Sequence, residues 1–256
     1  MPYDDPMEEG DLTDELEHIS SDIYLDVPFV PTDDAVIETM LDLANVGPDD
    51  ILYDLGSGDG RIVVAAAMTR NTSGVGIELD PMRVAEAMEY AADSRVEFLV
   101  DFIEEDIFSA DIREATVVTM YLLHSINIDL RPRLLKELRP GTRIVSHAFD
   151  MGDWTPDATL EVSGIGIYMW VVPAQVEGAW AWEDSNGNAF HIELEQKYQK
   201  ITGQAWQADE EIDIKSATLD GCDLRLALQK GPGAPRHRFT LTFDGTDLAE
   251  VVENAA

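Results

Sequence analysis

Ile51-Leu52-Tyr53-Asp54-Leu55-Gly56-Ser57-Gly58-Asp59-Gly60-Arg61 is the stretch of sequence that decides the fold. A short apolar strand runs through an acidic residue into a glycine-rich turn, and an apolar helix follows at 62–68. Nucleotide-like ligands bind in this strand–turn–helix setting, at the carboxyl end of a parallel strand. The glycines are spaced GxGxG rather than GxGxxG. A carboxylate beside the turn would not help to bind phosphate, so Asp54 favours a ligand with a cationic end.

Two further strands of the same type are expected downstream. An apolar strand is predicted at 74–79, with Glu78 and Leu79 at its carboxyl end. Glu78 lies 24 residues after Asp54. A carboxylate at the tip of a second strand can accept hydrogen bonds from both ribose hydroxyls of a nucleoside. A third strand is predicted at 96–100, and Asp106 and Ile107 follow it. Asp106 is the candidate ligand-binding acid after this strand, and Asp101 is the alternative candidate.

The glycine turn after Asp54, Glu78 after the second strand and Asp106-Ile107 after the third occur in the order found in class I methyltransferases that use S-adenosylmethionine (SAM), and the sequence resembles that class. The resemblance implies that Asp106 accepts a hydrogen bond from the adenine amino group and that Ile107 packs on the ring. Each residue also has an ordinary explanation. The glycines could serve only a turn with positive φ, Asp54 could cap the following helix, and Glu78 and Asp106 could be solvated surface charges.

A narrower resemblance covers residues 27 to about 156, about half of the chain. It rests on Val-Pro-Phe-Val-Pro-Thr at 27–32, on the glycine stretch, and on Asp153-Trp154-x-Pro156. Small protein-lysine methyltransferases of the ADP/ATP translocase and the ATP synthase c subunit share this pattern. The resemblance implies that Thr32 closes over the methionine end of SAM. The predicted cofactor-binding residues are therefore Thr32, Asp54, Gly56, Ser57, Gly58, Gly60, Glu78, Leu79, Asp106 and Ile107.

The predicted function is in-line transfer of a methyl group from SAM to an acceptor that is either a protein lysine or a small metabolite. Tyr121 and His124, after the fourth strand, are the candidate acceptor-pocket residues, and Asn127, His147 and Asp150 are further candidates. Tyr121 and His147 could instead be core or strand residues, His124 a surface loop residue and Asp150 a turn residue. Trp154 could be a pocket wall or could pack on the terminal hairpin, and packing is favoured. The fourth strand lacks the Asn/Asp-Pro-Pro-Tyr/Phe motif of enzymes that methylate amino groups of nucleic acids and glutamine.

Two other functions remain open from the sequence. The carboxyl-terminal region could bind a partner while the SAM-binding unit acts as a non-catalytic module. Aminopropyl transfer from decarboxylated SAM uses the same fold, but its acidic signature after the fourth strand is absent.

The chain is strongly acidic, with 51 Asp and Glu against 17 Lys and Arg, a net charge of −34 and a pI near 4.1. Such a charge repels nucleic acid and anionic membranes, so neither is an expected partner. The only basic clusters are Arg131-Pro-Arg133 and Arg236-His237-Arg238. Carboxylates spread along the whole chain are typical of proteins from salt-accumulating organisms, where salt screens the repulsion. A cationic substrate is the alternative explanation.

No disulfide can form within the chain because Cys222 is its single cysteine, and the five histidines show no metal-binding spacing. We expect no metal, no signal peptide, no membrane insertion and a cytoplasmic location. The sequence does not predict an oligomeric state.

The expected fold class is α/β. Residues 1–22 are predicted to form an acidic disordered tail, helical near 12–19, and residues 23–173 a SAM-binding Rossmann-like domain. Its mostly parallel strands are expected at 51–55, 74–79, 96–100, 116–122 and 143–149, with an antiparallel hairpin at 158–172 to end the sheet. Helices are expected at 33–44, 61–69, 81–92 and 129–138, with Pro81 and Pro132 in first turns.

Residues 174–256 are expected to form a separate antiparallel β-meander domain, a small twisted sheet or a partial barrel. Six alternating segments support it, at 176–182, 190–198, 205–206, 212–214, 224–228 and 237–243. Turn signals separate them, among them 184–187, 202–203, 220–221, 231–233 and 244–245.

Overall fold

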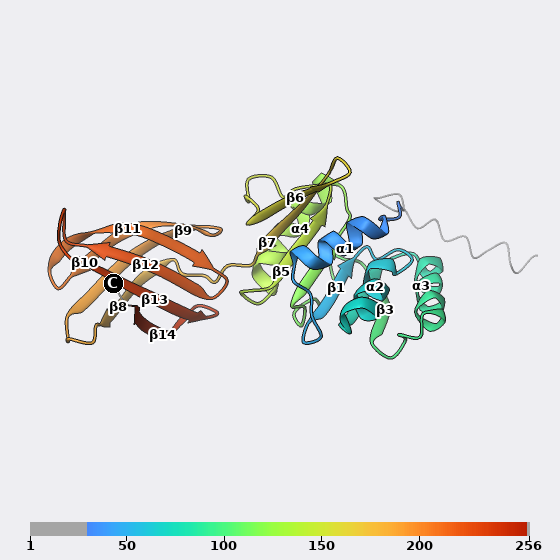
Figure 1. Cartoon of the computed structure of the whole chain (residues 1–256), viewed down its shortest axis with the longest axis horizontal. Helices are drawn as coiled ribbons and strands as arrows, with labels where there is room; N and C mark the ends of the chain where they lie inside the picture. The colour runs from blue at the N-terminus through green and yellow to red at the C-terminus, as the bar shows by residue number, and fades with distance from the viewer. Residues whose placement is uncertain (1–29, 255–256) are drawn as a thin grey trace, which may run out of the picture.

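The structure, a computed structural model, describes residues 30–254. The predicted acidic tail at 1–22 and residues 27–29 of the 27–32 motif lie outside the described residues. Two seven-stranded sheets make up the described part, and Figure 1 shows them in separate lobes, with every helix in the amino-terminal one. None of the helices in residues 30–254 has the length and apolar character needed to cross a bilayer.

The first sheet is mostly parallel, as expected, with strand order β3-β2-β1-β4-β5-β7-β6. Strands β1, β2, β3, β4 and β5 run parallel, whereas β7 pairs antiparallel with both β5 and β6. The sheet therefore ends in the predicted antiparallel hairpin. Its strands are β1 (Ile51–Leu55), β2 (Ser73–Glu78), β3 (Val100–Glu104), β4 (Val117–Met120), β5 (Arg143–His147), β6 (Ala158–Val162) and β7 (Ile165–Val171).

Four helices cover the two faces of this sheet: α1 (Asp34–Leu43), α2 (Arg61–Arg70), α3 (Pro81–Asp93) and α4 (His124–Glu137). One core joins the buried sides of α1, α2 and α3 to one face of the strands. A second core joins α4 and the buried residues of 110–115 to the other face. Apolar residues therefore fill both sides of the central strands, which is why their sequences do not alternate.

The third strand was predicted four residues too early. It spans Val100–Glu104 rather than 96–100, because Val100 is the residue that pairs with Gly74 of β2. Val96 is buried in the turn after α3, whereas Phe98 is 77% exposed. The apolar run that suggested a strand is thus a turn whose first residue packs on the core.

The fourth helix was also misplaced, because it begins at His124 rather than near residue 129. Pro132 consequently lies inside the helix, not in its first turn, where it gives up one backbone hydrogen bond. Leu130 and Leu134 on either side of it are fully buried, so packing onto the sheet stabilises a helix that local propensity disfavours. Pro81, in contrast, does occupy the first turn of α3.

The second sheet is an antiparallel meander with the sequential order β14-β13-β12-β11-β10-β9-β8. Its strands are β8 (Gly178–Glu183), β9 (Ala189–Lys197), β10 (Lys200–Gln207), β11 (Glu210–Asp220), β12 (Asp223–Gln229), β13 (Arg236–Asp244) and β14 (Asp247–Asn254). Alternate side chains form an apolar core that includes Phe190, Phe239 and Phe243.

Two features of the meander departed from expectation. Strand β14 was not predicted, because Asp247-Leu-Ala-Glu-Val-Val-Glu-Asn254 has a composition as typical of helices, and only pairing with β13 makes it a strand. The predicted turn at 202–203 is wrong, because both residues lie inside β10. A Cβ atom at Gly203 would collide with the backbone carbonyl of Glu193, so close approach to β9 explains this glycine.

The two lobes meet at the loop between β5 and β6. Trp154 is fully buried, and its indole Nε1 donates a hydrogen bond to Gln199 Oε1 at 2.9 Å. Lys197 forms an ion pair with Asp153 at 2.8 Å, and the Tyr198 ring stacks on Trp154 with centroids 5.7 Å apart. Trp154 therefore serves packing against the terminal hairpin, as predicted, with its ring centroid 5.9 Å from that of Trp170 on β7. Its contact with the β9–β10 turn was not predicted.

Candidate functional site

A cavity of about 380 Å³ opens at the carboxyl ends of β1, β2 and β4. This size lies within the usual range for small-molecule sites. Eight of the ten predicted cofactor-binding residues line it, together with Tyr121, whereas Gly58, Gly60 and His124 do not. The eight lining residues are Thr32, Asp54, Gly56, Ser57, Glu78, Leu79, Asp106 and Ile107.

The glycine turn folds back onto the end of β2. The amides of Gly56 and Ser57 both donate to the carbonyl of Ile77, at 2.9 and 3.0 Å. Gly56, Gly58 and Gly60 have φ values of 76°, 54° and 76°, a region that side chains with a Cβ disfavour. A Cβ at Gly60 would also lie 2.6 Å from the Phe102 ring. The glycines at 58 and 60 thus shape the turn from behind rather than form the cavity wall.

Backbone amides hold the Glu78 carboxylate in place. Its Oε2 accepts from Gly58 N at 2.8 Å, and its Oε1 accepts from Leu79 N at 2.9 Å and Asp80 N at 3.0 Å. Because β1 and β2 are adjacent and parallel, the glycine turn and Glu78 lie at the same edge of the sheet. The three donors fix the orientation of a charged group that also faces the cavity.

Asp54 is the buried acid of the site, with only 2% of its surface exposed. Its Oδ1 accepts a hydrogen bond from Thr119 Oγ1 at 2.8 Å, across the β1–β4 pair. Burial raises the pKa of Asp54 to about 7, against the lowering effect of Thr119, and the negative charges of Glu78 and Asp59 raise it further. A cationic ligand in the cavity would favour the ionised carboxylate.

The structure distinguishes between Asp106 and its rival Asp101. Asp106 lies on the cavity wall next to Ile107, and its carboxylate accepts from Phe108 N at 2.9 Å. Asp101 is an exposed residue of β3 whose carboxylate accepts from the Phe102 amide at 2.9 Å. Asp106 is therefore the acidic residue that the fold brings to the site.

The segment before α1 forms one side of the cavity. Thr32 is buried, and its hydroxyl lies 3.2 Å from His147 Nδ1. The carbonyl of Thr32 accepts from Arg61 Nη1 at 3.1 Å, and Arg61 is in turn paired with Asp59 at 2.6 Å. Two elements distant in sequence, the start of α2 and the end of β5, therefore hold Thr32 against the cavity.

Tyr121 lies directly over His147, with ring centroids 3.7 Å apart. His147 is 3% exposed, and within residues 30–254 its Nε2 has no hydrogen-bond partner. Burial lowers the pKa of His147, and the opposing influence of Asp33 is smaller, so the imidazole is neutral at pH 7. His147 thus acts as a buried support between Thr32 and Tyr121, and only the latter two face the cavity.

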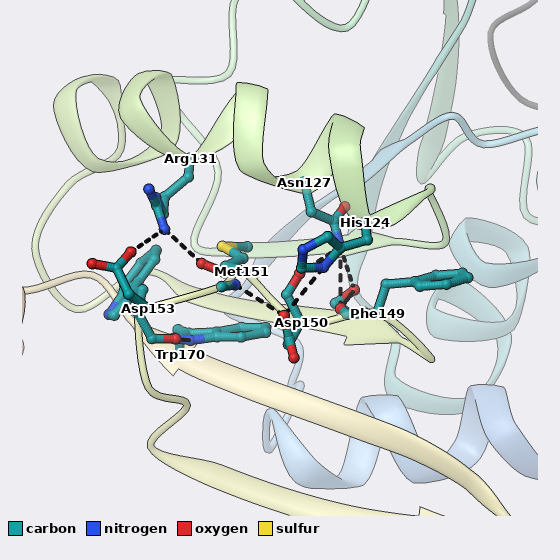
Figure 2. A network of polar contacts seen from close by, with 11 residues as sticks. His124, Asn127, Arg131, Phe149, Asp150, Met151, Asp153 and Trp170 are labelled. Carbon is teal, nitrogen blue, oxygen red and sulfur yellow. Dashed lines mark hydrogen bonds and ion pairs between the residues drawn. The ribbon is translucent and has the colours of Figure 1, made fainter.

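His124 and Asn127 belong to a separate polar network beside the cavity (Figure 2). His124 Nδ1 lies 3.2 Å from Asp150 Oδ1, with both side chains about half exposed. Asn127 is fully buried, and its amide donates to Ser146 Oγ and to the Phe149 carbonyl, both at 3.1 Å. Arg131, one helical turn further along α4, donates to the Met151 carbonyl at 2.6 Å.

This network holds the loop after β5 against α4. Because His124, Asn127 and Arg131 are three and four residues apart, they share one helix face, and Figure 2 shows that face turned toward residues 149–153. Of the two residues proposed for the acceptor pocket, the structure brings Tyr121 to the cavity and places His124 in the network instead.

Several cavity residues were not predicted. Asp59 and Arg61 lie within the glycine stretch, but their pairing and their contact with Thr32 depend on how the segment before α1 folds back. Asp80 and Arg83 follow the end of β2 and line the cavity. Their closeness to Glu78 in the sequence is the signal that could have identified them. The cavity is also lined by the apolar residues Val30, Pro31, Ile62, Phe108, Leu122 and Ile126.

Three groups able to bind a metal also converge in the second sheet, although no metal site was expected from the sequence. Ligand atoms of Asp184, His237 and Glu253 lie within 4.8 Å of one another. The Asp184 carboxylate already accepts from Asn186 N at 2.9 Å and Asn188 N at 2.8 Å, and Glu253 accepts from Ser185. Hydrogen bonds from residues of the turn between β8 and β9 therefore account for both carboxylates, that of Asp184 within the turn and that of Glu253 on β14.

Comparisons with known proteins agree on the class. The family model of the ANTKMT methyltransferase domain matches residues 54–158. A crystal structure of an RNA methyltransferase from Salinibacter ruber with bound S-adenosylhomocysteine is 53% identical, with a TM-score of 0.57. That match covers 57% of this chain and 96% of the other. Fold and cavity together define a SAM-dependent methyltransferase.

Protein-lysine methyltransferases are among the relatives. A protein-lysine N-methyltransferase from Saccharolobus islandicus is 45% identical over 137 residues, which are 53% of this chain and 85% of that protein. The mouse adenine nucleotide translocase lysine N-methyltransferase is 33% identical over 138 residues, 54% of this chain and 60% of that protein. The chain belongs to the ANTKMT methyltransferase family.

Proposed function

We propose that this enzyme transfers the methyl group of SAM to the side chain of a lysine residue in a protein. The observation that carries the proposal is the 45% identity to an archaeal protein-lysine methyltransferase along 85% of that protein's length. The mouse relative named for the adenine nucleotide translocase supports the same class of acceptor. The cavity itself suits cations, because its lining includes Asp54, Asp59, Glu78, Asp80 and Asp106.

The cavity has the donors and acceptors that SAM needs. Ser57 Oγ is a buried polar atom that has no partner within residues 30–254, and Ser57 lines the cavity. We assign Glu78 to the ribose hydroxyls, Asp106 and Ile107 to the adenine, and the glycine turn, Asp54 and Thr32 to the methionine part. Acidic groups suit that part because it carries a sulfonium and an ammonium group.

When bound, SAM supplies a methyl group that is already activated by the positive sulfur. The residues of the chain then have to orient the lysine amine in line with the methyl–sulfur bond and to keep water out. A lysine ammonium must lose its proton before it can attack, and a desolvated apolar wall lowers its pKa. We assign that wall to Tyr121 with Leu122 and Ile126, held in place by the buried His147 beneath Tyr121.

RNA is the second candidate acceptor, since the Salinibacter ruber relative is described as an RNA methyltransferase. Two observations weigh against RNA for this chain. A net charge of −34 repels phosphates, and the cavity lining has more carboxylates than guanidinium groups. The tip of β4, Met120-Tyr121-Leu122-Leu123, also lacks the motif of amino-methylating nucleic acid enzymes.

One labelling experiment separates the two acceptors. The purified enzyme is incubated with methyl-labelled SAM and an extract from the source organism, and samples are then treated with protease or with ribonuclease. We expect the label to be lost with protease, to survive ribonuclease, and to be recovered as methyl-lysine after hydrolysis. The Glu78→Ala variant, which we expect not to bind SAM, is the negative control. Label released by ribonuclease would replace the proposed acceptor with RNA.

A further inference from the structure

The outer face of the second sheet carries a cluster of cations that the methyltransferase site does not use. Lys215, Arg225, Arg236 and Arg238 line a shallow groove of about 640 Å³ on strands β11, β12 and β13. We call this surface the arginine face. Four of the 17 Lys and Arg residues of a chain with net charge −34 thus gather in one place.

Strand register explains why these side chains share a face. Arg238 pairs with Ala227, Arg236 with Gln229 and Arg225 with Thr240, while the alternate residues Leu224, Leu226, Leu228, Phe239 and Leu241 point into the core. Arg236 and Arg238 are therefore about 6.7 Å apart along β13. Arg225 is a diagonal neighbour of Arg238, about 7–8 Å away.

The two arginines at the centre have no carboxylate partner. Lys215 pairs with Asp213 at 2.7 Å and Arg225 with Asp220 at 3.3 Å, both at the margins of the face. Arg236 and Arg238 are exposed, and their side chains make no hydrogen bond or ion pair with any residue of 30–254. In a chain with a threefold excess of carboxylates, two adjacent unpaired guanidinium groups form a site complementary to an external anion.

The groups between the cations are hydrogen-bonding side chains. Ser216, Thr218 and Asn254 line the same groove, and the Asn254 amide donates to Thr240 Oγ1 at 2.9 Å. Hydroxyl and amide groups beside arginines suit carboxylate or phosphate oxygens equally. Their chemistry therefore defines an anion site without by itself naming the anion.

The surroundings favour carboxylates on a polypeptide over a nucleic acid. Asp213 and Asp220 border the groove and would repel a phosphate backbone that continues past it, whereas a peptide can place neutral residues there. The lining has no outward aromatic ring for a base to stack on, because Phe239 is buried in the core. Trp206 lies on β10, where it pairs with Glu211 of β11, and its ring stacks on His191 of β9, away from the groove lining.

We propose that the arginine face docks an acidic segment of a partner protein, with two of its carboxylates paired to Arg236 and Arg238. Salt screens the repulsion from the rest of the chain, with a Debye length of about 3 Å at 1 M, and it also weakens exposed ion pairs. Ion pairs that become partly buried when the segment docks are screened less, so we expect peptide binding to weaken with salt but not to disappear. This inference concerns the second sheet and does not depend on which acceptor the cavity methylates.

The test is direct binding to the full-length enzyme. A fluorescent oligoglutamate peptide and a fluorescent oligouridylate of equal charge are titrated with the enzyme at low and at molar KCl, and anisotropy is followed. We expect the peptide to bind more tightly than the RNA, and the double variant Arg236→Gln/Arg238→Gln to weaken peptide binding by about tenfold or more. SAM affinity should be unchanged, and an unchanged circular dichroism spectrum and thermal midpoint show that the second sheet of the variant is folded.

The matched control removes two positive charges elsewhere. Arg95 is exposed and, like Lys136 on α4, has no ion pair with residues 30–254, so Arg95→Gln/Lys136→Gln should change peptide affinity by less than about twofold. A second variant, Ala227→Glu, places a carboxylate opposite Arg238 and should block the peptide without removing an arginine. No peptide binding, an equal loss in the control, or tighter arginine-dependent binding of the RNA would overturn the proposal.

Discussion

The two sheets of this protein bury charge in different ways. In the first sheet, Asp54 is enclosed by strands and helices, and burial raises its pKa to about 7. In the turn between β8 and β9 of the second sheet, Asp184 is also mostly buried, yet a hydrogen bond from the Asn188 side chain lowers its pKa, with further lowering from backbone amides of the same turn. The difference teaches that burial alone does not mark a functional acid. A carboxylate left short of donors beside a cavity is poised for a ligand, whereas a fully bonded one stabilises a turn.

The sheets also differ in how they build a binding surface. Parallel strands bring the ends of β1, β2 and β4 to one edge, where side chains distant in sequence line a cavity. The antiparallel meander leaves its outer face open, so its arginines form a shallow groove instead. The first arrangement encloses a small molecule, and the second suits an extended partner.

The largest expected effect comes from removing a carboxylate from the cavity. Glu78→Ala deletes the group held by three backbone amides, and we expect SAM affinity to fall by about a hundredfold or more. Glu193→Ala, at an exposed position of β9, is the matched control and should change affinity less than twofold. Calorimetric titration with SAM measures both. Equal affinities for Glu78→Ala and the parent protein would refute the assignment of the ribose site.

The next prediction compares two glycines that have similar φ angles but different surroundings. Gly60 and Gly187 have φ values of 76° and 80°, but a Cβ would meet Phe102 at 2.6 Å at Gly60 and nothing within 4 Å at Gly187. We expect Gly60→Ala to lower the free energy of unfolding by about 3 kcal/mol, through strain and overpacking together. Gly187→Ala should cost about 1 kcal/mol, from backbone strain alone. Denaturant unfolding at constant m-value measures the two, and equal losses would contradict the packing argument.

The third prediction uses the pKa of Asp54. Because this pKa is raised in the folded protein to about 7, the contribution of Asp54 to stability is present at low pH and is lost as pH rises through 7. SAM, being cationic, favours the ionised form, so its affinity should increase as pH rises toward 7, by up to about tenfold per pH unit, and then level off. Calorimetry across this range in two buffers would also detect proton release.

Two variants distinguish the role of Asp54 from that of Asp184. Asp54→Asn should abolish the pH dependence of SAM binding near 7. Asp184→Asn should leave SAM binding unchanged and instead reduce stability above the ordinary pKa of aspartate, because the pKa of Asp184 is lowered in the folded state. A pH profile of SAM binding that survives in Asp54→Asn would assign the titration to another group.

The smallest and least site-specific effect is that of salt. With a net charge of −34, self-repulsion weakens the folded state at low ionic strength, and we expect the unfolding midpoint to rise by several degrees or more between about 0.1 and 2 M KCl. Thermal unfolding followed by circular dichroism measures it, with sucrose as the uncharged control. A flat or falling midpoint would contradict the halophilic interpretation and favour a cationic substrate as the reason for the acidity.

Much of the first sheet could be predicted because its signals are local. Residues 51–61 specify a strand, a turn that needs positive φ, and a helix, and Glu78 follows at a spacing set by one helix and one strand. The hairpin at 158–172 was equally clear. The third strand and the fourth helix were misplaced because pairing with Gly74 and packing of Leu130 and Leu134 decided their limits.

By itself the sequence determined the class of fold, the cofactor and most residues of the cavity wall, because each depends on residues close together in the chain. Only the tertiary structure decided that Asp106 rather than Asp101 faces the cavity, that His147 supports Tyr121 and Thr32, and that His124 belongs to the α4 network. It also assembled the arginine face from three strands. These arrangements follow from strand order and register, which join residues that no local pattern connects.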